Sequence, residues 1–308
     1  MQEGDVRTAN TQLRAGSKTL AIFGYSLNAD VLRAHADGPL RPRELEEKIG
    51  WAPQSSLRST VAGLCDLAAL VRLESDDGSQ NAATELTEAG RELLPVATIL
   101  ERWLQLAPDG PIPLESTAAH GTVKVLTAGW DSTMIRTMAE RPLTLNETNA
   151  GIVGLSYPAL KRRLAKLRST HLVTSVPGNT AAYAATDWLR FSVVPLAMAG
   201  RWERKHDPEA EPISPVEVEA AFLMTLPFVE LSDEVSGSCT LAVLTSDDRN
   251  GGEPEVAGVT VEIANGKVTS CAADNASAPT TWALGTTDAW LDAVIGRASC
   301  RERVSECV

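Results

Sequence analysis

The stretch RPLTLNETNAGIVGLSYPALKRRLAKLR, residues 141–168, decides the fold of this chain. Residues 143–153 predict a short helix, and Gly154-Leu155 predicts the turn that follows it. Ser156 is expected to cap a further helix, and Pro158 is tolerated in its first turn because the amide hydrogens there lack partners within the helix. The pattern is that of a helix-turn-helix.

The helix expected after Ser156 combines one apolar stripe with a cationic surface. Leu160, Leu164 and Leu167 are spaced i, i+4 and i+7, which places them on a face that packs against a core. The rest of the circumference carries Lys161, Arg162, Arg163, Lys166 and Arg168, of which Arg162 and Lys166 are expected opposite the stripe. Tyr157 stands at the leading end, which would enter a groove of DNA. This face predicts nucleic-acid contact, and the alternative is a solvated surface.

Two short strands are expected after this helix, over residues 172–176 and 181–185. The turn-forming cluster at 177–180, which includes Asn179, joins them into a wing, and Asn179 is a further candidate DNA contact. A closing helix is expected from residue 186 to about residue 206. Together these elements predict a winged helix-turn-helix.

The same pattern is written twice in the chain, roughly 103 residues apart, and self-similarity at a fixed spacing identifies the architectural unit. Matched pairs include Pro39 with Pro142, Glu44 with Glu147, Leu57 with Leu160 and, beyond the wing, Thr87 with Thr186 and Trp103 with Trp202. The first copy predicts helices at about 19–36, 41–49 and 54–70, a wing at 71–86 and a closing helix at 87–106. The two matched tryptophans are expected in the core or at an interface.

The outward positions of the first copy's third helix are mostly neutral. They are Gln54, Ser55, Ser56, Arg58, Ser59 and Thr60. Such side chains can bind base edges or phosphates, although they release few counterions. Gln54, Ser55, Arg58 and Ser59 are therefore candidate DNA contacts, and the alternative is that this copy is a structural partner.

Residues 141–147, 154–157, 160–167 and 172–173 together resemble the signature of bacterial winged-helix regulators of the HxlR type, relatives of the MarR type. Residues 38–42 keep the pattern more loosely, and Trp51 departs from it in the turn. The resemblance covers roughly residues 18–206. It implies a transcription regulator that binds double-stranded DNA, in a family whose members pair as two-fold dimers.

The expected fold class is mostly α with small β wings, followed by a C-terminal α+β domain. Module 1 covers residues 18–107 and module 2 covers residues 114–206, joined by the Pro-rich spacer APDGPIP at 107–113. Because such a spacer is semi-rigid, one chain is predicted to form a pseudo-dimer, with a homodimer as the alternative.

A different domain is expected at 214–294. It combines a helix at 216–226, strands at 239–245, 259–263, 267–272 and 281–285, and a helix at 287–294, with Asn265-Gly266 as a hairpin turn. This order resembles domains of the sterol-carrier-protein type, which implies an apolar small-molecule effector. The alternative is a packing module without a ligand. Residues 295–308 resemble translated sequencing-adapter read-through and are interpreted as a non-native tail.

Charge divides unevenly along the chain, whose net charge is −12. Residues 1–107 carry 11 Lys and Arg against 15 Asp and Glu, residues 108–206 carry 12 against 7, and residues 207–308 carry 5 against 18. A basic module can bind phosphate while an acidic one limits indiscriminate binding. No run approaches the roughly 20 apolar residues that span a bilayer, so a cytoplasmic protein without membrane contact is expected.

Nothing in the sequence favours an enzyme. The five cysteines form no CxxC pair, and the four histidines are scattered. The sequence contains neither the pattern of a catalytic triad nor that of a phosphate-binding loop. We therefore expect no catalytic residues, no metal and no cofactor. The leading expectation is a DNA-binding transcription regulator; the alternative is a lipid-type carrier or a protein-interaction scaffold whose winged helices bind protein.

Overall fold

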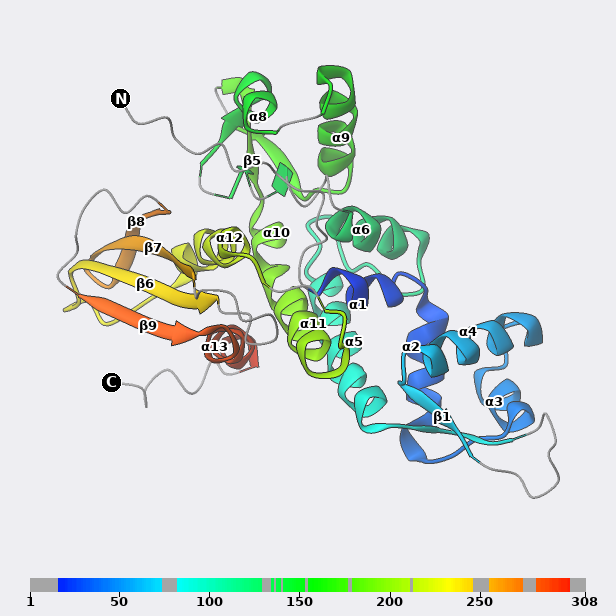
Figure 1. Cartoon of the computed structure of the whole chain (residues 1–308). Helices are drawn as coiled ribbons and strands as arrows, with labels where there is room; N and C mark the ends of the chain where they lie inside the picture. Colours follow the sequence, from blue (N-terminus) through cyan, green and yellow to red (C-terminus); the bar gives the residue numbers. More distant parts are fainter. Residues whose placement is uncertain are drawn as a thin grey trace.

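The computed structural model describes residues 16–73, 82–128, 134–135, 137–139, 141–152, 155–176, 179–210, 213–245, 255–273 and 281–299. Most of these residues are helical, and the strands form one two-stranded, one three-stranded and one four-stranded sheet (Figure 1). The chain therefore has a mixed α+β fold with small sheets. The predicted turns at 76–78, 154 and 177–178 and most of the 295–308 tail lie outside the described residues.

The described part of the first repeat contains five α-helices, one short 3-10 helix and a two-stranded sheet. They are α1 (Ser17–Ile22), α2 (Ser26–Ala34), the short η1 (His35–Asp37), α3 (Pro42–Ile49), α4 (Gln54–Asp66), β1 (Leu70–Arg72), β2 (Thr84–Leu86) and, closing the repeat, α5 (Glu88–Gln105). The single helix predicted over 19–36 is wrong, because Tyr25 has an extended backbone and the Asn28 side chain donates to the carbonyl of Ile22 at 2.6 Å.

The second repeat has the same order, with one additional strand. It consists of α6 (Thr117–Thr127), β3 (Leu143–Thr144), α8 (Leu145–Gly151), α9 (Tyr157–Ser169), β4 (Val173–Val176), β5 (Asn179–Ala185), α10 (Asp187–Phe191) and α11 (Val193–His206). The closing helix predicted over 186–206 is divided at Ser192. Ser156 is the N-cap residue of α9, but its side chain makes no capping hydrogen bond, so that detail of the prediction is wrong.

Matched positions in the two repeats share unusual local geometry. Ala68 and His171, which correspond in sequence, both have a positive φ, of 54° and 56°. The Thr87 hydroxyl donates to the carbonyl of Ala68 at 2.6 Å, and the matching Thr186 hydroxyl donates to the carbonyl of His171 at 2.9 Å. A positive φ is uncommon for residues with a side chain, so its occurrence at both positions reflects one local structure built twice.

Three tryptophans join the two repeats. The Trp103 indole nitrogen donates to the carbonyl of Trp188 at 2.8 Å, and the Trp202 indole nitrogen donates to the carbonyl of Ala89, also at 2.8 Å. Trp103 matches Trp202 and Ala89 matches Trp188, so one hydrogen bond is made twice in opposite directions. That reciprocity is the mark of a two-fold interface. Both matched tryptophans are buried, as predicted.

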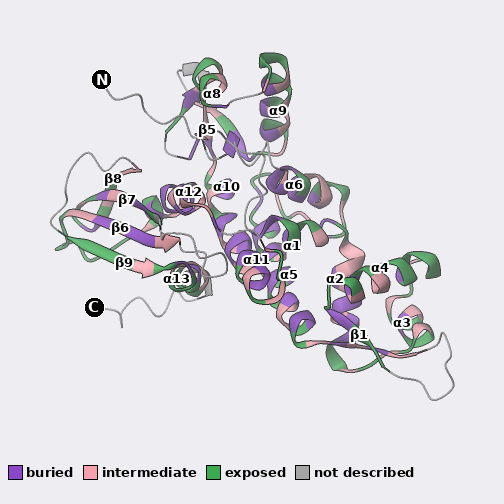
Figure 2. Cartoon of the chain, viewed as in Figure 1, coloured by how far each residue is buried: buried purple, intermediate pink, exposed green. Residues whose placement is uncertain are grey.

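Stacking and a third hydrogen bond reinforce this contact. The rings of Trp103 and Trp188 are 4.6 Å apart and 9° from parallel, and the Trp188 indole donates back to the carbonyl of Trp103 at 2.9 Å. Figure 2 shows buried residues concentrated in α5 and α11, the helices that carry Trp103 and Trp202, whereas Trp188 lies on α10. Lys205 and His206 add ion pairs to Glu92 at the edge of the interface.

Helix α1 crosses from the first repeat to the second. It packs against α6 and α11, and the buried Glu203 side chain of α11 accepts hydrogen bonds from the backbone of Gly16 at 2.7 Å and Thr19 at 2.8 Å. Burial raises the pKa of Glu203, and these two donors oppose that rise. Gly16 has a φ of 81°, and a Cβ there would collide with the carbonyl of Leu196, so only glycine fits this approach.

The C-terminal part is a sheet with helices packed on it. It consists of α12 (Pro215–Thr225), η2 (Leu226–Phe228), β6 (Gly237–Thr245), β7 (Glu255–Ala264), β8 (Lys267–Ala272), β9 (Trp282–Thr286) and α13 (Thr287–Ser299). The strand order is β8-β7-β6-β9, and β9 runs parallel to β6. The hairpin predicted at Asn265-Gly266 is confirmed by the antiparallel pairing of β7 with β8. Helix α13 extends through Ser299, into the predicted tail.

The tryptophan interface yields a test of stability. Trp103→Ala should lower the free energy of unfolding by about 3–5 kcal/mol, because the change leaves a large cavity between the repeats. Trp103→Phe keeps an aromatic ring but leaves the carbonyl of Trp188 without its donor, and should lower the free energy of unfolding by about 1–3 kcal/mol. Trp282→Ala, at a residue 60% exposed on β9, is the control and should stay within about 0.5 kcal/mol. Urea denaturation measures all three; a Trp103→Ala variant as stable as the control contradicts the interface.

Candidate nucleic-acid interface

Helix α9 presents most of its cationic surface to solvent. Its buried stripe is Leu160, Leu164 and Leu167, as predicted. The exposed side chains are Tyr157, Lys161, Arg162 and Arg168, whereas Arg163 and Lys166 are half-buried. With 3.6 residues per turn, Arg162 lies opposite the leucines. Lys166 is half-buried and takes part in an interaction within the chain, and its predicted position opposite the leucines stays a prediction.

A capping box fixes the start of α8, the helix that packs against α9. The Glu147 carboxylate accepts from the backbone N–H of Thr144 at 2.8 Å and from its hydroxyl at 2.7 Å, and Arg141 pairs with it at 2.9 Å. These interactions, the backbone bond foremost, lower the pKa of Glu147 to about 2. The matching Glu44 accepts from the backbone of Arg41 at 2.6 Å. Both repeats therefore orient the helix before the turn in the same way.

The wing lies beside the C-terminal end of α9. The guanidinium carbon of Arg168 is 5.7 Å from the centre of the Tyr183 ring on β5, a cation–π contact. This contact directs Arg168 toward the wing rather than outward. Asn179 opens β5 and pairs with Val176, but its side chain lies outside the described part of the structure, so its role remains a prediction.

Helix α4 presents a mostly neutral surface. Gln54, Ser55, Arg58 and Ser59 are all exposed, while Leu57 and Leu64 are buried. The Gln54 amide donates to the Glu46 carboxylate at 3.3 Å, which ties the first turn of α4 to α3. The structure therefore brings the predicted residues to one accessible face, where Arg58 supplies the charge.

The turn before α4 is shaped by Gly50 and Trp51. Gly50 has a φ of 71°, and Trp51 is 61% exposed. Trp51, Asp30 and Lys48 line a shallow surface cavity of about 290 Å³. Burial raises the pKa of Asp30, while Arg33 and a hydrogen bond to Trp51 oppose that rise. Trp51 thus packs beside α2 and leaves the outer face of α4 accessible.

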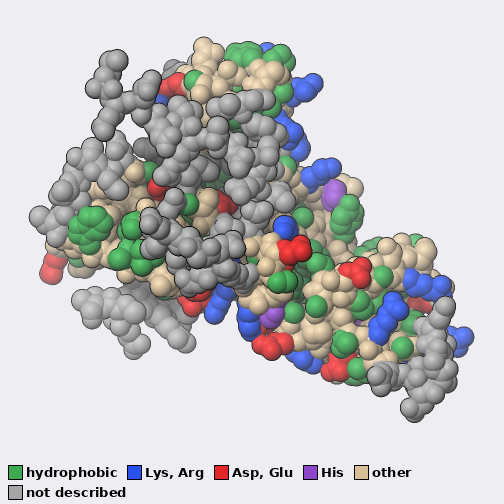
Figure 3. Space-filling view, in the orientation of Figure 1, with side chains coloured by type: hydrophobic (Ala, Val, Ile, Leu, Met, Phe, Trp, Pro, Cys, Tyr) green, Lys and Arg blue, Asp and Glu red, His purple; other side chains and the backbone are tan. Residues whose placement is uncertain are grey.

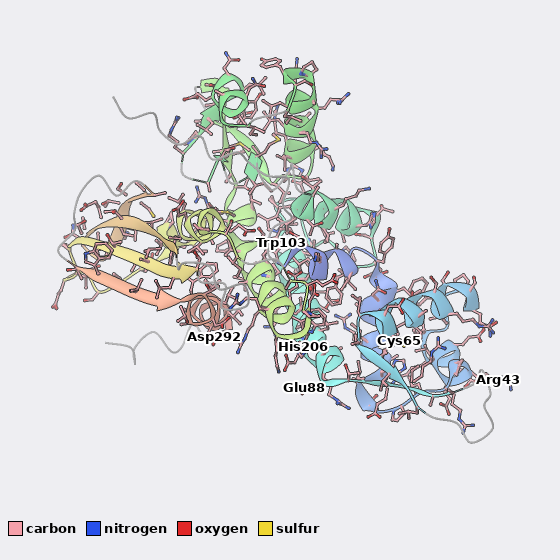
Figure 4. All side chains as sticks on the ribbon, in the orientation of Figure 1. Arg43, Cys65, Glu88, Trp103, His206 and Asp292 are labelled. Carbon is pink, nitrogen blue, oxygen red and sulfur yellow. The ribbon has the colours of Figure 1, made fainter. Side chains whose placement is uncertain are left out.

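Three exposed cations extend this surface beyond the predicted residues: Arg43 on α3, Arg72 on β1 and Lys124 on α6. Figure 3 shows Lys and Arg side chains over α9, α6 and the α3–α4 region, and Figure 4 places Arg43 on the outer side of α3. The sequence argument missed Lys124 because it did not identify the helix that carries it. The apolar spacing of Ala119, Val123 and Leu126 would have revealed α6.

The described residues contain no group of three or more His, Cys, Asp or Glu side chains able to hold a metal ion. Nor does any helix in the described ranges combine the length and the apolar composition needed to cross a membrane. The exposed side chains of α9 and α4 include cations, hydroxyls and amides, groups that can bind an anionic polymer.

Comparison with known proteins adds no family assignment. No protein-family model matches the chain, and a search of the curated proteins finds no match. The functional argument therefore depends on the geometry of this surface.

The capping box predicts a distinctive titration. The pKa of Glu147 is lowered, so its contribution to stability should be present at neutral pH and lost as the pH falls through about 2. The side-chain carboxyl resonance of Glu147, followed by NMR, should titrate with a midpoint near 2. Thr144→Val removes the hydroxyl but keeps the backbone donor and should raise that midpoint partway. A midpoint near the ordinary value of 4.5 in the unmodified chain would contradict the observed contacts.

Proposed function

We propose that this chain is a DNA-binding transcription regulator in which α9 and α4 act as the recognition helices of two winged helix-turn-helix modules. The observation that carries the proposal is the exposed cationic face of α9, on which Arg162 lies opposite the buried leucines and Lys161 is exposed beside them. A helix with this surface, preceded by a capped helix and followed by a β-wing, has the geometry that enters a major groove. The residue pattern shared with HxlR-type regulators supports the same conclusion.

The reciprocal tryptophan contact suggests how one chain uses both helices. Regulators of this class place two recognition helices in successive major grooves by forming a two-fold dimer. Here Trp103 and Trp202 make the same bond in opposite directions within one polypeptide. Figure 1 shows α9 and α4 with α6 and α1 between them, an arrangement that suits a single duplex spanning both modules. The proposed DNA-binding unit is therefore the intramolecular pseudo-dimer.

The C-terminal domain is proposed to regulate this unit. A cavity of about 30 Å³ lies between α11, α12 and α13, lined by Glu217 together with Leu196, Ile213, Trp290 and other apolar side chains. It has room for roughly one water molecule, so a larger apolar effector must separate these helices to enter. Because α11 also carries Trp202, such a movement would reach the interface between the modules. An effector acts only through this kind of differential contact.

The first test removes charge from α9. Lys161→Ala combined with Arg162→Ala should weaken duplex binding roughly tenfold at 0.15 M salt and reduce the slope of log affinity against log salt by about 2, as two phosphate contacts are lost. The control, Arg201→Ala with Lys267→Ala, removes the same charge from α11, on the side that faces α13, and from β8, and should leave binding nearly unchanged. Fluorescence anisotropy over a salt series measures both. Equal affinities, or binding that salt does not weaken, would reject DNA in favour of a protein partner.

The second test concerns the attachment of the C-terminal domain. The half-buried Arg190 side chain donates to the carbonyl of Leu223 on α12 at 2.9 Å and to that of Ala139 at 3.3 Å. Arg190→Ala should therefore lower the free energy of unfolding by about 1–3 kcal/mol. The matching residue Arg91 forms only an exposed ion pair with Glu85, and Arg91→Ala should cost at most about 1 kcal/mol. Equal losses in urea denaturation would contradict a special role for Arg190.

A further inference from the structure

A small cluster of polar side chains lies where α1 meets α6. Tyr25 follows α1 and is 67% exposed, and its ring is 5.1 Å from that of His120 on α6. Nδ1 of His120 is 2.7 Å from the carbonyl oxygen of Gly24. A carbonyl only accepts, so Nδ1 carries the hydrogen and Nε2 is the acceptor in the neutral ring. Lys124 follows one helical turn after His120 and is exposed. We call these three side chains the saddle.

The saddle occupies the centre of the proposed DNA-binding surface. Figure 1 shows α6 and α1 between α9 and α4, and Figure 3 shows a His and a basic side chain together over α6. Between His120 and Lys124, a Cβ added at Gly121 would meet no atom within 4 Å. This part of α6 is therefore open to a close approach by another molecule.

The geometry of the double helix determines which groove of the DNA would face the saddle. Two half-sites one helical turn apart present their major grooves on the same side of the duplex, and the minor groove faces that side halfway between them. Lysine and histidine side chains are attracted into a narrow minor groove by its enhanced negative potential. Tyrosine hydroxyls bind the phosphates that border it. The saddle supplies all three side-chain types at this position.

We propose that Tyr25, His120 and Lys124 form a third DNA contact, on the minor groove between the two half-sites bound by α9 and α4. This inference depends on the proposed function, because it requires both modules to bind one duplex. It adds a source of specificity: the saddle senses the width of the minor groove in the spacer, which depends on sequence even where no base edge is read. Operators with an A·T-rich centre would therefore bind best.

The experiment uses the full chain and a 40-base-pair duplex that it selects from a random-sequence library. Hydroxyl-radical footprinting reports minor-groove protection along the duplex, and fluorescence anisotropy reports affinity. Wild type should protect the centre of the site as well as the flanks of both half-sites. Lys124→Ala should lose the central protection, keep the flanking protection, weaken binding by about fivefold and lower the salt slope by about 0.9. Lys267→Ala is the matched control and should behave as wild type.

The outcomes separate the two proposals. If wild type protects both half-sites but leaves the centre open, or if Lys124→Ala keeps the central protection and full affinity, the saddle contact is rejected and the proposed function stands. If wild type selects and protects no duplex, the proposed function fails and the saddle contact fails with it. Circular dichroism of Lys124→Ala confirms that the variant is folded; Lys124→Arg, which restores the charge, should restore the central protection.

Discussion

The structure depends on a pair of indole hydrogen bonds that cross between the two repeats. Trp103 and Trp202 each donate to a carbonyl in the opposite repeat, and the stacked ring of Trp188 fills the space beside them. Two large buried aromatic side chains with satisfied donors contribute much apolar burial together with fixed geometry. This contact holds α5 against α11 and so sets where α4 and α9 lie relative to each other.

The two repeats are not equivalent, because only the second repeat contacts the C-terminal domain. Arg91 remains on the surface, whereas its counterpart Arg190 is half-buried and donates a hydrogen bond to the carbonyl of Leu223 on α12. Helix α11 also forms ion pairs with α13, through Arg201 to Asp292 at 2.8 Å and Arg204 to Asp288 at 2.9 Å. The second repeat therefore carries both the cationic face of α9 and the contacts to the acidic C-terminal domain, while the exposed face of α4 in the first repeat is more neutral.

Local periodicity was enough to predict much of this arrangement. The leucine stripe of α9, the hairpin at Asn265-Gly266 and the burial of the matched tryptophans all follow from spacing and turn chemistry, and the structure confirms them. Other features depend on contacts distant in sequence. The break at Tyr25 combines a local bond, from the Asn28 side chain to the carbonyl of Ile22, with a hydrogen bond from His120 to the carbonyl of Gly24 that joins distant parts of the sequence. The half-burial of Lys166 is not encoded in its local pattern. The saddle likewise joins residues from two repeats and has no signature in either.

The central claim is that one polypeptide contains both DNA-binding modules of a pseudo-two-fold dimer. Sedimentation velocity of the full chain with a selected 40-base-pair duplex tests it most directly, because it gives the number of chains per duplex, and footprinting of the same complex gives the number of half-sites. The account predicts one chain on each duplex with two protected half-sites one helical turn, about 34 Å, apart. Two chains for two half-sites, or one chain protecting a single half-site, would contradict it.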